Sequence, residues 1–312
     1  MSELPPQRTD EHLPGYEPYV GEVGVMDAVR MGWNLMMSDF WPIWLLGLIV
    51  VAVLGGIGGA LGVFMVIPIV NLLGACLMIV VGIFVQPPFL AGLFYAVGRV
   101  IDGQKAEAGQ VFEGFRQRYW PSVVAVLLPM GLGFGIALVF GGIAGVLIAA
   151  TGADQDEEAL AAITLLVGLP MYLVLFLVGL LFMFTLVAVW DHPESGWEAM
   201  KTSVRVVKEH YLSTLGFALL FALITLAAEI VGLLACCVGV LFTMPVVMVW
   251  SAASMVYLYR SWTGQPLTQP LADGPAGEGP PPPPPPPPVP GAGTDEDRGG
   301  PVPPGDIEMP PT

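Results

Sequence analysis

Six long apolar runs, almost free of charged residues, constrain this chain more than any other feature. Lipid offers a backbone no hydrogen-bonding partner, so an apolar run of about 20 residues is stable there as a helix. The stretch 42–101 is long enough for two such helices, with a break near 67–71. The other four runs cover 120–150, 160–190, 213–234 and 238–259. The pattern predicts an all-α polytopic membrane protein with six transmembrane helices.

Charge is concentrated outside these runs. Only 12% of the 312 residues are charged, against about 25% in a typical soluble domain, and the net charge is −15. Residues 1–24 hold five acids and one arginine, and residues 264–312 hold seven acids and one arginine. This composition predicts disordered tails at 1–24 and 265–312 around a membrane domain at 25–264. It shows no basic patch suited to nucleic acid.

The C-terminal tail contains nine consecutive prolines, 280–288, among glycines and acids. Such a run forms a polyproline II rod, which serves either as a solvated spacer or as a ligand for a soluble Pro-binding protein. The absence of a flanking basic anchor favours the spacer.

One short amphipathic segment, 191–212, reads DHPESGWEAMKTSVRVVKEHYL. Ser195 and Glu198 have the spacing of a capping box, which predicts a helix start. Apolar residues then recur every three or four positions and form one face, which we expect to lie in lipid: Trp197, Met200, Val204, Val207 and Tyr211. Lys201, Arg205 and Lys208 form a basic face, which favours anionic headgroups. The alternative for these three cations is ordinary anchoring at the membrane surface.

Two weaker copies of this segment are VMDAVRMGWNLMMSDFW at 25–41 and VFEGFRQRYWP at 111–121. Each copy precedes a pair of apolar runs. The pattern predicts three degenerate helical-hairpin repeats, about 25–103, 104–195 and 196–264, each preceded by an interfacial amphipathic helix. Prolines predict a broken helix at Gln86-Pro87-Pro88 and kinks near Pro129, Pro170 and Pro245.

The eleven Lys and Arg residues predict the orientation. With six spans all eleven fall on one side of the membrane, and the opposite loops contain none. The positive-inside rule therefore predicts that both termini and all three amphipathic helices are cytoplasmic.

Three polar residues within the apolar runs are candidate site residues. Glu229 is the only acid well inside a predicted span, where an ionisable group can handle ions or bind a polar ligand. Its place about six residues from the outer end favours a structural acid within reach of water. Asn71 and Gln86 could line a polar cavity at a broken helix, although amides more often make interhelical hydrogen bonds.

Catalytic and cofactor motifs are lacking. The three cysteines lie in apolar runs without a C-x-x-C spacing, which indicates neither a disulfide framework nor a metal site. Asp191-His192 and Glu209-His210 pair a carboxylate with a histidine, but adjacent residues on a helix do not face each other. We therefore predict no enzyme activity, no catalytic residue, no metal and no cofactor.

A family resemblance is carried by AVRMGWNLMMSDFWPIWLLG, QPPFLAGLFYAVGRVIDGQ, GWEAMKTSVRVVKEHYLSTLGFALL and YLYRSWTGQ. Over about 25–264 the chain resembles a bacterial group of six-helix membrane proteins that includes the membrane domain joined to glycerophosphoryl diester phosphodiesterases. The catalytic phosphodiesterase domain is not among the matching stretches. The resemblance implies a location in the bacterial cytoplasmic membrane and no catalytic residues.

These patterns lead to one functional hypothesis and two rivals. The leading hypothesis is a non-enzymatic scaffold or lipid-interacting module whose partners are membrane lipids and a soluble protein bound through the Pro-rich tail. The first rival is a small-solute or lipid transporter with a path near Glu229, Asn71 and Gln86, although same-orientation repeats differ from the inverted pairs of many transporters. The second is an enzyme acting on a lipid headgroup, which requires Asp191 and His192 to assemble with residues of another repeat. Oligomeric state stays open.

Overall fold

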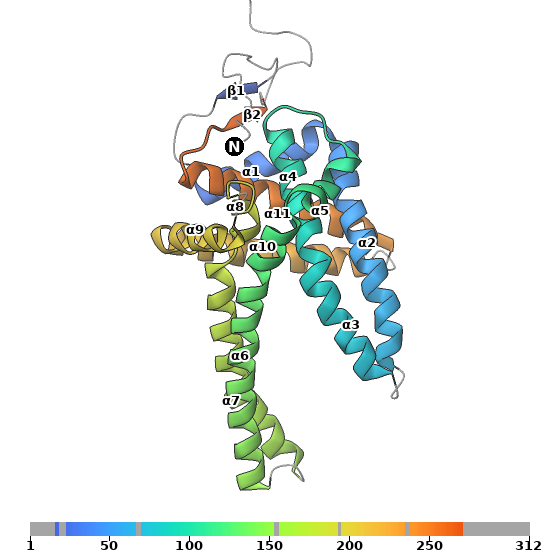
Figure 1. Ribbon diagram of the computed structural model, residues 1–312, viewed down its shortest axis with the longest axis vertical. Helices are drawn as coiled ribbons and strands as arrows, with labels where there is room; N and C mark the ends of the chain where they lie inside the picture. Colours follow the sequence, from blue (N-terminus) through green and yellow to red (C-terminus); the bar gives the residue numbers. More distant parts are fainter. Residues whose placement is uncertain are drawn as a thin grey trace, which may run out of the picture. The chain divides into compact units, whose positions relative to one another are not determined.

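The structure, a computed structural model, describes residues 16–18, 23–66, 70–152, 156–192, 195–234 and 238–270. This part of the chain is mostly helical, and its strands are one pair of three residues each (Figure 1). Within it, six helical segments are long and apolar enough to cross a membrane, which confirms the number predicted from the sequence. They are Phe40–Phe64, Asn71–Ile101, Tyr119–Thr151, Glu157–Ala188, Tyr211–Leu234 and Gly239–Trp262.

Short helices lead into three of the long ones. Helix α1 (Val25–Ser38) precedes α2 (Phe40–Val66), and α9 (Gly196–Glu209) precedes α10 (Tyr211–Leu234). Between them, η1 (Ala108–Phe112) and α5 (Glu113–Gln117) precede α6 (Tyr119–Thr151). In each case one residue with non-helical dihedral angles separates the two helices: Asp39, Arg118 and His210. We call the end of the molecule where these short helices lie the basic end.

The second long segment is broken where the prolines predict. Helix α3 (Asn71–Phe84) ends before Val85, and α4 (Gln86–Ile101) follows. Pro87 and Pro88 occupy the first turn of α4, where a backbone N–H has no intrahelical acceptor and its loss costs little. The predicted break between the first two long segments also lies between α2 and α3.

The fourth long segment breaks at a place that the sequence does not predict. Helix α7 (Glu157–Leu181) runs through Pro170, and the chain leaves the helix only at Phe182–Phe184 before α8 (Thr185–Ala188). The buried Ser203 of α9 compensates for the break: its hydroxyl accepts from Phe184 N at 3.2 Å and donates to Leu181 O at 3.0 Å. Two backbone groups freed by the break are thus satisfied by a side chain distant in sequence.

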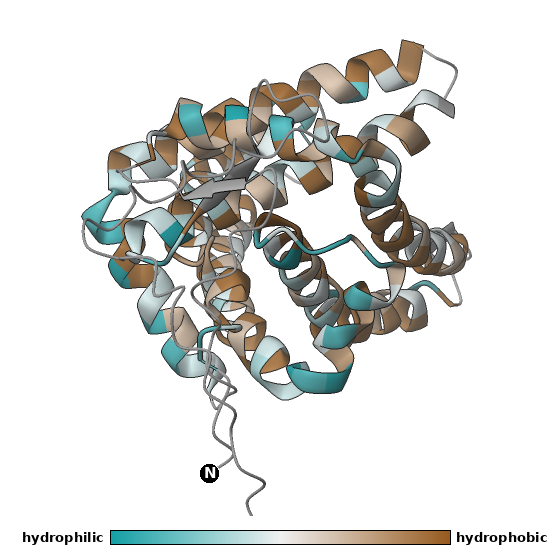
Figure 2. Ribbon diagram, turned by 90° about the horizontal axis from the view of Figure 1, so that it is seen from above, coloured by the Kyte–Doolittle hydropathy of each residue, from teal (hydrophilic) through white to brown (hydrophobic). Residues whose placement is uncertain are grey.

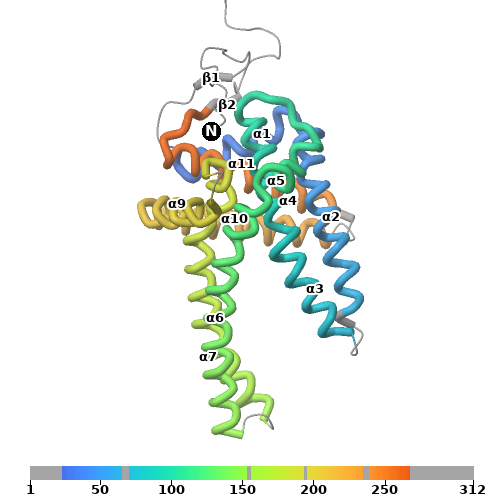
Figure 3. Tube along the Cα trace, in the orientation of Figure 1, coloured from blue at the N-terminus to red at the C-terminus, as the bar shows by residue number. Residues whose placement is uncertain are grey.

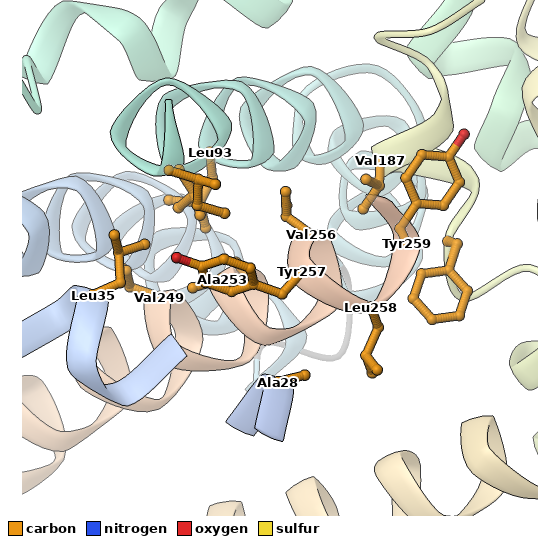
Figure 4. Packing of buried hydrophobic residues seen from close by; sticks show 14 of the residues in the cluster. Ala28, Leu35, Leu93, Val187, Val249, Ala253, Val256, Tyr257, Leu258 and Tyr259 are labelled. Atoms are coloured by element: carbon orange, nitrogen blue, oxygen red, sulfur yellow. The ribbon is translucent and has the colours of Figure 1, made fainter. Parts of the chain in front are cut away.

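The core surrounds the C-terminal half of α11 (Val238–Trp262). Pro245 lies within the N-terminal half of this helix. Figure 4 shows Val256, Tyr257 and Tyr259 of α11 packed with residues of α1, α4 and α8. Helix α1 packs along α11, η1 and α5 pack on α4, and α9 packs on α6 and α8. In the trace of Figure 3 the blue α1 lies beside the orange α11, although they are the first and the last helix of the described chain.

The first turns of α2 contact the first turns of α11. Trp44 Nε1 donates to Phe242 O at 3.2 Å, and a Cβ on Gly47 would collide with the backbone of Pro245. Helix α2 begins at the basic end. Helix α11 begins at the turn of the α10–α11 hairpin, which would lie far from the basic end if this hairpin were placed like the other two. The two helices therefore cross, so α10–α11 is not placed like a third copy of α2–α3 or α6–α7.

A short antiparallel ladder joins the two predicted tails. Strand β1 (Tyr16–Pro18) pairs with β2 (Thr268–Pro270), with Glu17 opposite Gln269. These two strands fall in segments that the sequence analysis predicts to be disordered. Residues 23–24 and 265–267 of those tails are also described, whereas the proline run lies outside the described residues.

Candidate functional site

Helix α9 lies on the protein with a wide buried face. Met200 and Val207, which we predicted to face lipid, are buried together with Ala199, Ser203 and Val206. Trp197 of the predicted stripe is 45% exposed. The lipid assignment is therefore wrong for Met200 and Val207, because the small residues Ala199 and Ser203 turn this side of the helix onto its neighbours. Sequence patterning missed it because small and polar residues do not count as apolar.

The predicted basic face of α9 points away from the bundle. Lys201, Arg205 and Lys208 are all exposed. Lys201 Nζ lies 2.9 Å from Glu198 Oε1 and 5.5 Å from the centre of the Trp197 ring. Ser195 caps the helix by accepting from Glu198 N at 3.4 Å, while the Glu198 carboxylate pairs with Lys201. The hydrogen bond from Lys201 lowers the pKa of Glu198 below its usual value.

Helix α1 repeats this division between a buried and an exposed side. Val29 and Met36 are buried against the protein, whereas Met26 and Trp33 are exposed. Close packing on α11 depends on Gly32, because a Cβ there would collide with Ser254 and the backbone of Trp250. Beside it lies a surface groove of about 420 Å³ lined by Met26, Asp27, Val29, Arg30, Trp33 and Trp250. Figure 2 shows hydrophilic residues gathered at the short helices and loops, while the long helices are mostly hydrophobic.

The three intramembrane candidates are not brought together. Asn71 begins α3, Gln86 begins α4, and Glu229 lies in α10. All three side chains are exposed on the surface of the protein. None of them lines the groove beside α1 or the cavity described next.

A cavity of about 350 Å³ lies at the basic end, where the ends of α4, α8 and α11 meet the junction of α5 and α6. We call it the arginine cavity. Three of its lining residues are arginines and two are aspartates. The lining comprises Phe94, Tyr95, Gly98, Arg99, Asp102, Gln117, Arg118, Val187, Trp190, Asp191, Val256, Tyr259, Arg260 and Gln265.

Two of the arginines flank a pair of stacked rings. Tyr95 and Trp190 stack with ring centres 4.4 Å apart. The Arg118 guanidinium lies 5.5 Å from the centre of the Trp190 ring, and that of Arg99 lies 5.6 Å from the centre of the Tyr95 ring. Arg99 Nη1 also donates to Tyr95 Oη at 3.1 Å. Trp190 is fixed by its own hydrogen bond to Ala91 O, at 2.8 Å.

The two aspartates of the cavity are occupied by other groups. Asp102 receives two hydrogen bonds from Arg260, at 2.5 and 3.1 Å. Asp191 accepts from Tyr259 Oη at 2.5 Å and from Gln265 Nε2 at 2.7 Å. Asp191 thus meets residues that follow it by more than 60 positions, as the enzyme hypothesis requires.

The histidines that follow Asp191 and Glu209 in the sequence make other contacts. His192 Nε2 lies 2.9 Å from Thr202 Oγ1. His210 stacks on Trp262, with ring centres 4.5 Å apart. In the described ranges, no three His, Cys, Asp or Glu side chains are grouped so as to hold a metal ion.

Arg118 and Arg99 are held without a carboxylate partner among the described residues. The Nε atoms of both are buried and have no hydrogen-bond partner there. Burial also lowers the pKa of the Arg118 guanidinium below its ordinary value. A guanidinium stays charged in proteins, so these are two partly desolvated cations without an adjacent anion.

Sequence reasoning missed this cavity. From the sequence, Arg99, Arg118 and Arg260 served only to predict the orientation of the chain in the membrane. The available signal was that aromatic and charged residues occur close together at the ends of the second, fourth and sixth runs. Examples are Tyr259-Arg260 and Trp190-Asp191. That signal is also typical of ordinary membrane anchors, and only the packing of three run ends separates the two interpretations.

Comparisons with known proteins give one match. The family described as "Domain of unknown function (DUF7847)" matches residues 24–259. No curated protein and no solved structure matches the chain. The resemblance to phosphodiesterase-linked membrane domains stays a prediction.

Proposed function

We propose that this chain, which belongs to the DUF7847 family, is a non-enzymatic membrane module that binds anionic phospholipid through the exposed cations of α9. Helix α9 is fixed to α6 and α8 through its buried face, and this directs Lys201, Arg205 and Lys208 away from the protein. Each basic residue near an anionic membrane surface contributes about 1 kcal/mol of attraction. The proposal rests on this observation: the buried face of α9 holds its three exposed cations in a fixed direction, away from the protein.

The proposal includes the orientation of the chain in the membrane and the threefold repeat of short helix and helical hairpin. The bilayer is the bacterial cytoplasmic membrane, and both termini and the short helices α1, η1, α5 and α9 lie on its cytoplasmic side, in accord with the positive-inside rule. The threefold repeat is supported by the equivalent starts of α2, α6 and α10 at Phe40, Tyr119 and Tyr211. It is also supported by packing, since each short helix packs on the last helix of the preceding hairpin, in cyclic order. The crossing of α2 and α11 makes the repeat an imperfect one.

A transporter path near Glu229, Asn71 and Gln86 has less support. A shared path requires these side chains to line a common interior, whereas they are exposed on three different helices. A soluble partner for the Pro-rich tail stays a prediction.

The test is lipid retention by the purified full-length protein. Wild-type protein in detergent is mixed with phosphatidylglycerol or phosphatidylcholine, and bound lipid is counted by native mass spectrometry. We expect preferential retention of phosphatidylglycerol, and loss of that preference in the Lys201→Gln/Arg205→Gln/Lys208→Gln variant. The charge-preserving variant Lys201→Arg/Arg205→Lys/Lys208→Arg serves as the control and should keep the preference. A wild type without preference, or a triple Gln variant that keeps it, refutes the proposal.

A further inference from the structure

We propose that the arginine cavity is a binding site for a phosphate-bearing anion, with Arg99 and Arg118 as the residues that hold it. The site is distinct from the surface of α9, because none of Lys201, Arg205 and Lys208 lines the cavity. The inference therefore goes beyond surface lipid binding and does not rest on it.

Charge is the first argument. The cavity contains three arginines and two aspartates, an excess of one positive charge. Arg260 is matched by Asp102, and Asp191 is satisfied by the neutral donors of Tyr259 and Gln265. Arg99 and Arg118 keep no carboxylate partner within the described part of the chain. A partly buried cation is costly unless an anion compensates for it, and a bound anion between these elements supplies that compensation.

The position of the two guanidinium groups beside aromatic rings also favours this ligand. Each lies over an aromatic ring, Arg118 over Trp190 and Arg99 over Tyr95. Arg99 Nη1 donates to Tyr95 Oη and the Nε atoms of both arginines are buried, so the remaining Nη groups are the donors that would hold a ligand. The planar fork of N–H donors matches the oxygen atoms of phosphate. The stack of Tyr95 on Trp190 makes one rigid support for both cations.

The size of the cavity limits which ligands can bind. Its volume of about 350 Å³ lies within the range of small-molecule sites, roughly 300–1,000 Å³. A water molecule takes only about 30 Å³, so the space admits a phosphate group together with an attached organic group. Asp102 and Gln117 of the lining are exposed, which connects the cavity to the surface. A phospholipid headgroup and a soluble phosphorylated compound share this chemistry.

The experiment uses full-length protein in detergent and inorganic phosphate as the first probe. Phosphate is titrated at constant ionic strength, and binding is followed by calorimetry and by the shift in apparent melting temperature. We expect wild-type protein to bind, and Arg118→Gln and Arg99→Gln to bind at least about tenfold more weakly, which corresponds to the loss of one charge-assisted contact. Arg116→Gln is the matched control, because Arg116 lies two residues before Arg118 in the sequence, is exposed and pairs with Glu113. Its affinity should equal that of the wild type.

A variant with the opposite expected sign guards against simple misfolding. Asp102→Asn removes the carboxylate that occupies Arg260 and frees a third guanidinium at the cavity. We expect it to bind phosphate more tightly than the wild type, an increase that a damaged fold does not produce.

A second arm distinguishes the two sources of the phosphate group. The same variants are reconstituted in nanodiscs with or without phosphatidic acid. If inorganic phosphate stabilises the protein and phosphatidic acid adds nothing, a soluble ligand is supported. Stabilisation by phosphatidic acid beyond that given by inorganic phosphate, with the same dependence on Arg99 and Arg118, supports a lipid headgroup. The proposal is overturned if neither probe stabilises the wild type, if Arg116→Gln weakens binding as much as Arg118→Gln, or if Asp102→Asn weakens it. The α9 triple Gln variant should bind phosphate normally, so this result is separate from the test of surface lipid binding.

Discussion

The core around α11 and the α6–α7 hairpin use similar apolar residues in opposite ways. Of the 18 residues in the apolar window of the last long segment, 39% are buried within the protein, whereas only 11% are buried in that of α6. Large side chains of the hairpin, such as Phe134 and Leu169, stay exposed. In a bilayer, lipid covers such side chains, and their contribution to folding is small because lipid and protein interior are equally apolar. Packing within the protein is therefore concentrated at the basic end.

The largest expected difference between the two regions comes from a pair of phenylalanines. Phe184 is fully buried against Tyr259 and Trp262, whereas Phe134 is 65% exposed. Phe184→Ala should lower the free energy of unfolding by about 3–5 kcal/mol, as for other buried aromatic residues. Phe134→Ala should change it by much less. Unfolding in mixed micelles measures both, and equal losses would mean that the hairpin is packed as tightly as the core.

Glycines give the next largest contrast. Gly92 of α4 touches the backbone of Val111, with which an added Cβ would collide, while Gly141 of α6 has open space around it. Gly92→Ala should destabilise by about 3 kcal/mol because backbone must move. Gly141→Ala should be neutral or slightly stabilising, because glycine is a poor helix former. Thermal unfolding of the purified variants checks the pair, and a tolerated Gly92→Ala would contradict the close packing of η1 on α4.

Ser203 tests the break that separates α7 from α8. Ser203→Ala removes two hydrogen bonds and leaves a buried N–H and C=O without partners, which should cost about 2 kcal/mol. The exposed Ser213 provides the same substitution at a neutral place. If Ser203→Ala and Ser213→Ala unfold at the same temperature, the serine does not hold the break.

The smallest effect is a dependence on pH at α9. The folded-state pKa of Glu198 lies below its unfolded value because of the hydrogen bond from Lys201. The stabilisation is therefore present above the unfolded pKa, near 4.5, and is lost as the pH falls through the folded pKa. When the pH is lowered from 7 to 4, the melting temperature of Glu198→Gln should fall by less than that of the wild type. Glu209→Gln is the control and should follow the wild type. A wild type and a Glu198→Gln variant with identical pH profiles would show that the pair contributes nothing.

Sequence patterns predict the spans well and the packing poorly. The breaks near 67–71 and at Gln86 are visible because Pro and the change in polarity act locally. The break at Phe182–Phe184 is not, because its stabilising partner Ser203 comes from another helix. The arginine cavity is hidden for the same reason, since Arg118 acquires its environment from Trp190 only in the folded chain. Periodicity describes one helix at a time, whereas these features need two or more.

The pairing of α1 with α11 has a consequence for how the protein is made. Trp250 Nε1 donates to Val29 O at 2.8 Å, and Val23 N, just before α1, donates to Ser261 Oγ at 2.9 Å, so the first helix of the described chain is completed by the last one. During synthesis the N-terminal part emerges first. Helix α1 must therefore wait, with its inner face uncovered, until nearly the whole chain has left the ribosome and entered the membrane. A ribosome stalled before residue 250 would leave that face exposed, which makes the uncovered α1 a marker by which incomplete chains can be told from finished ones.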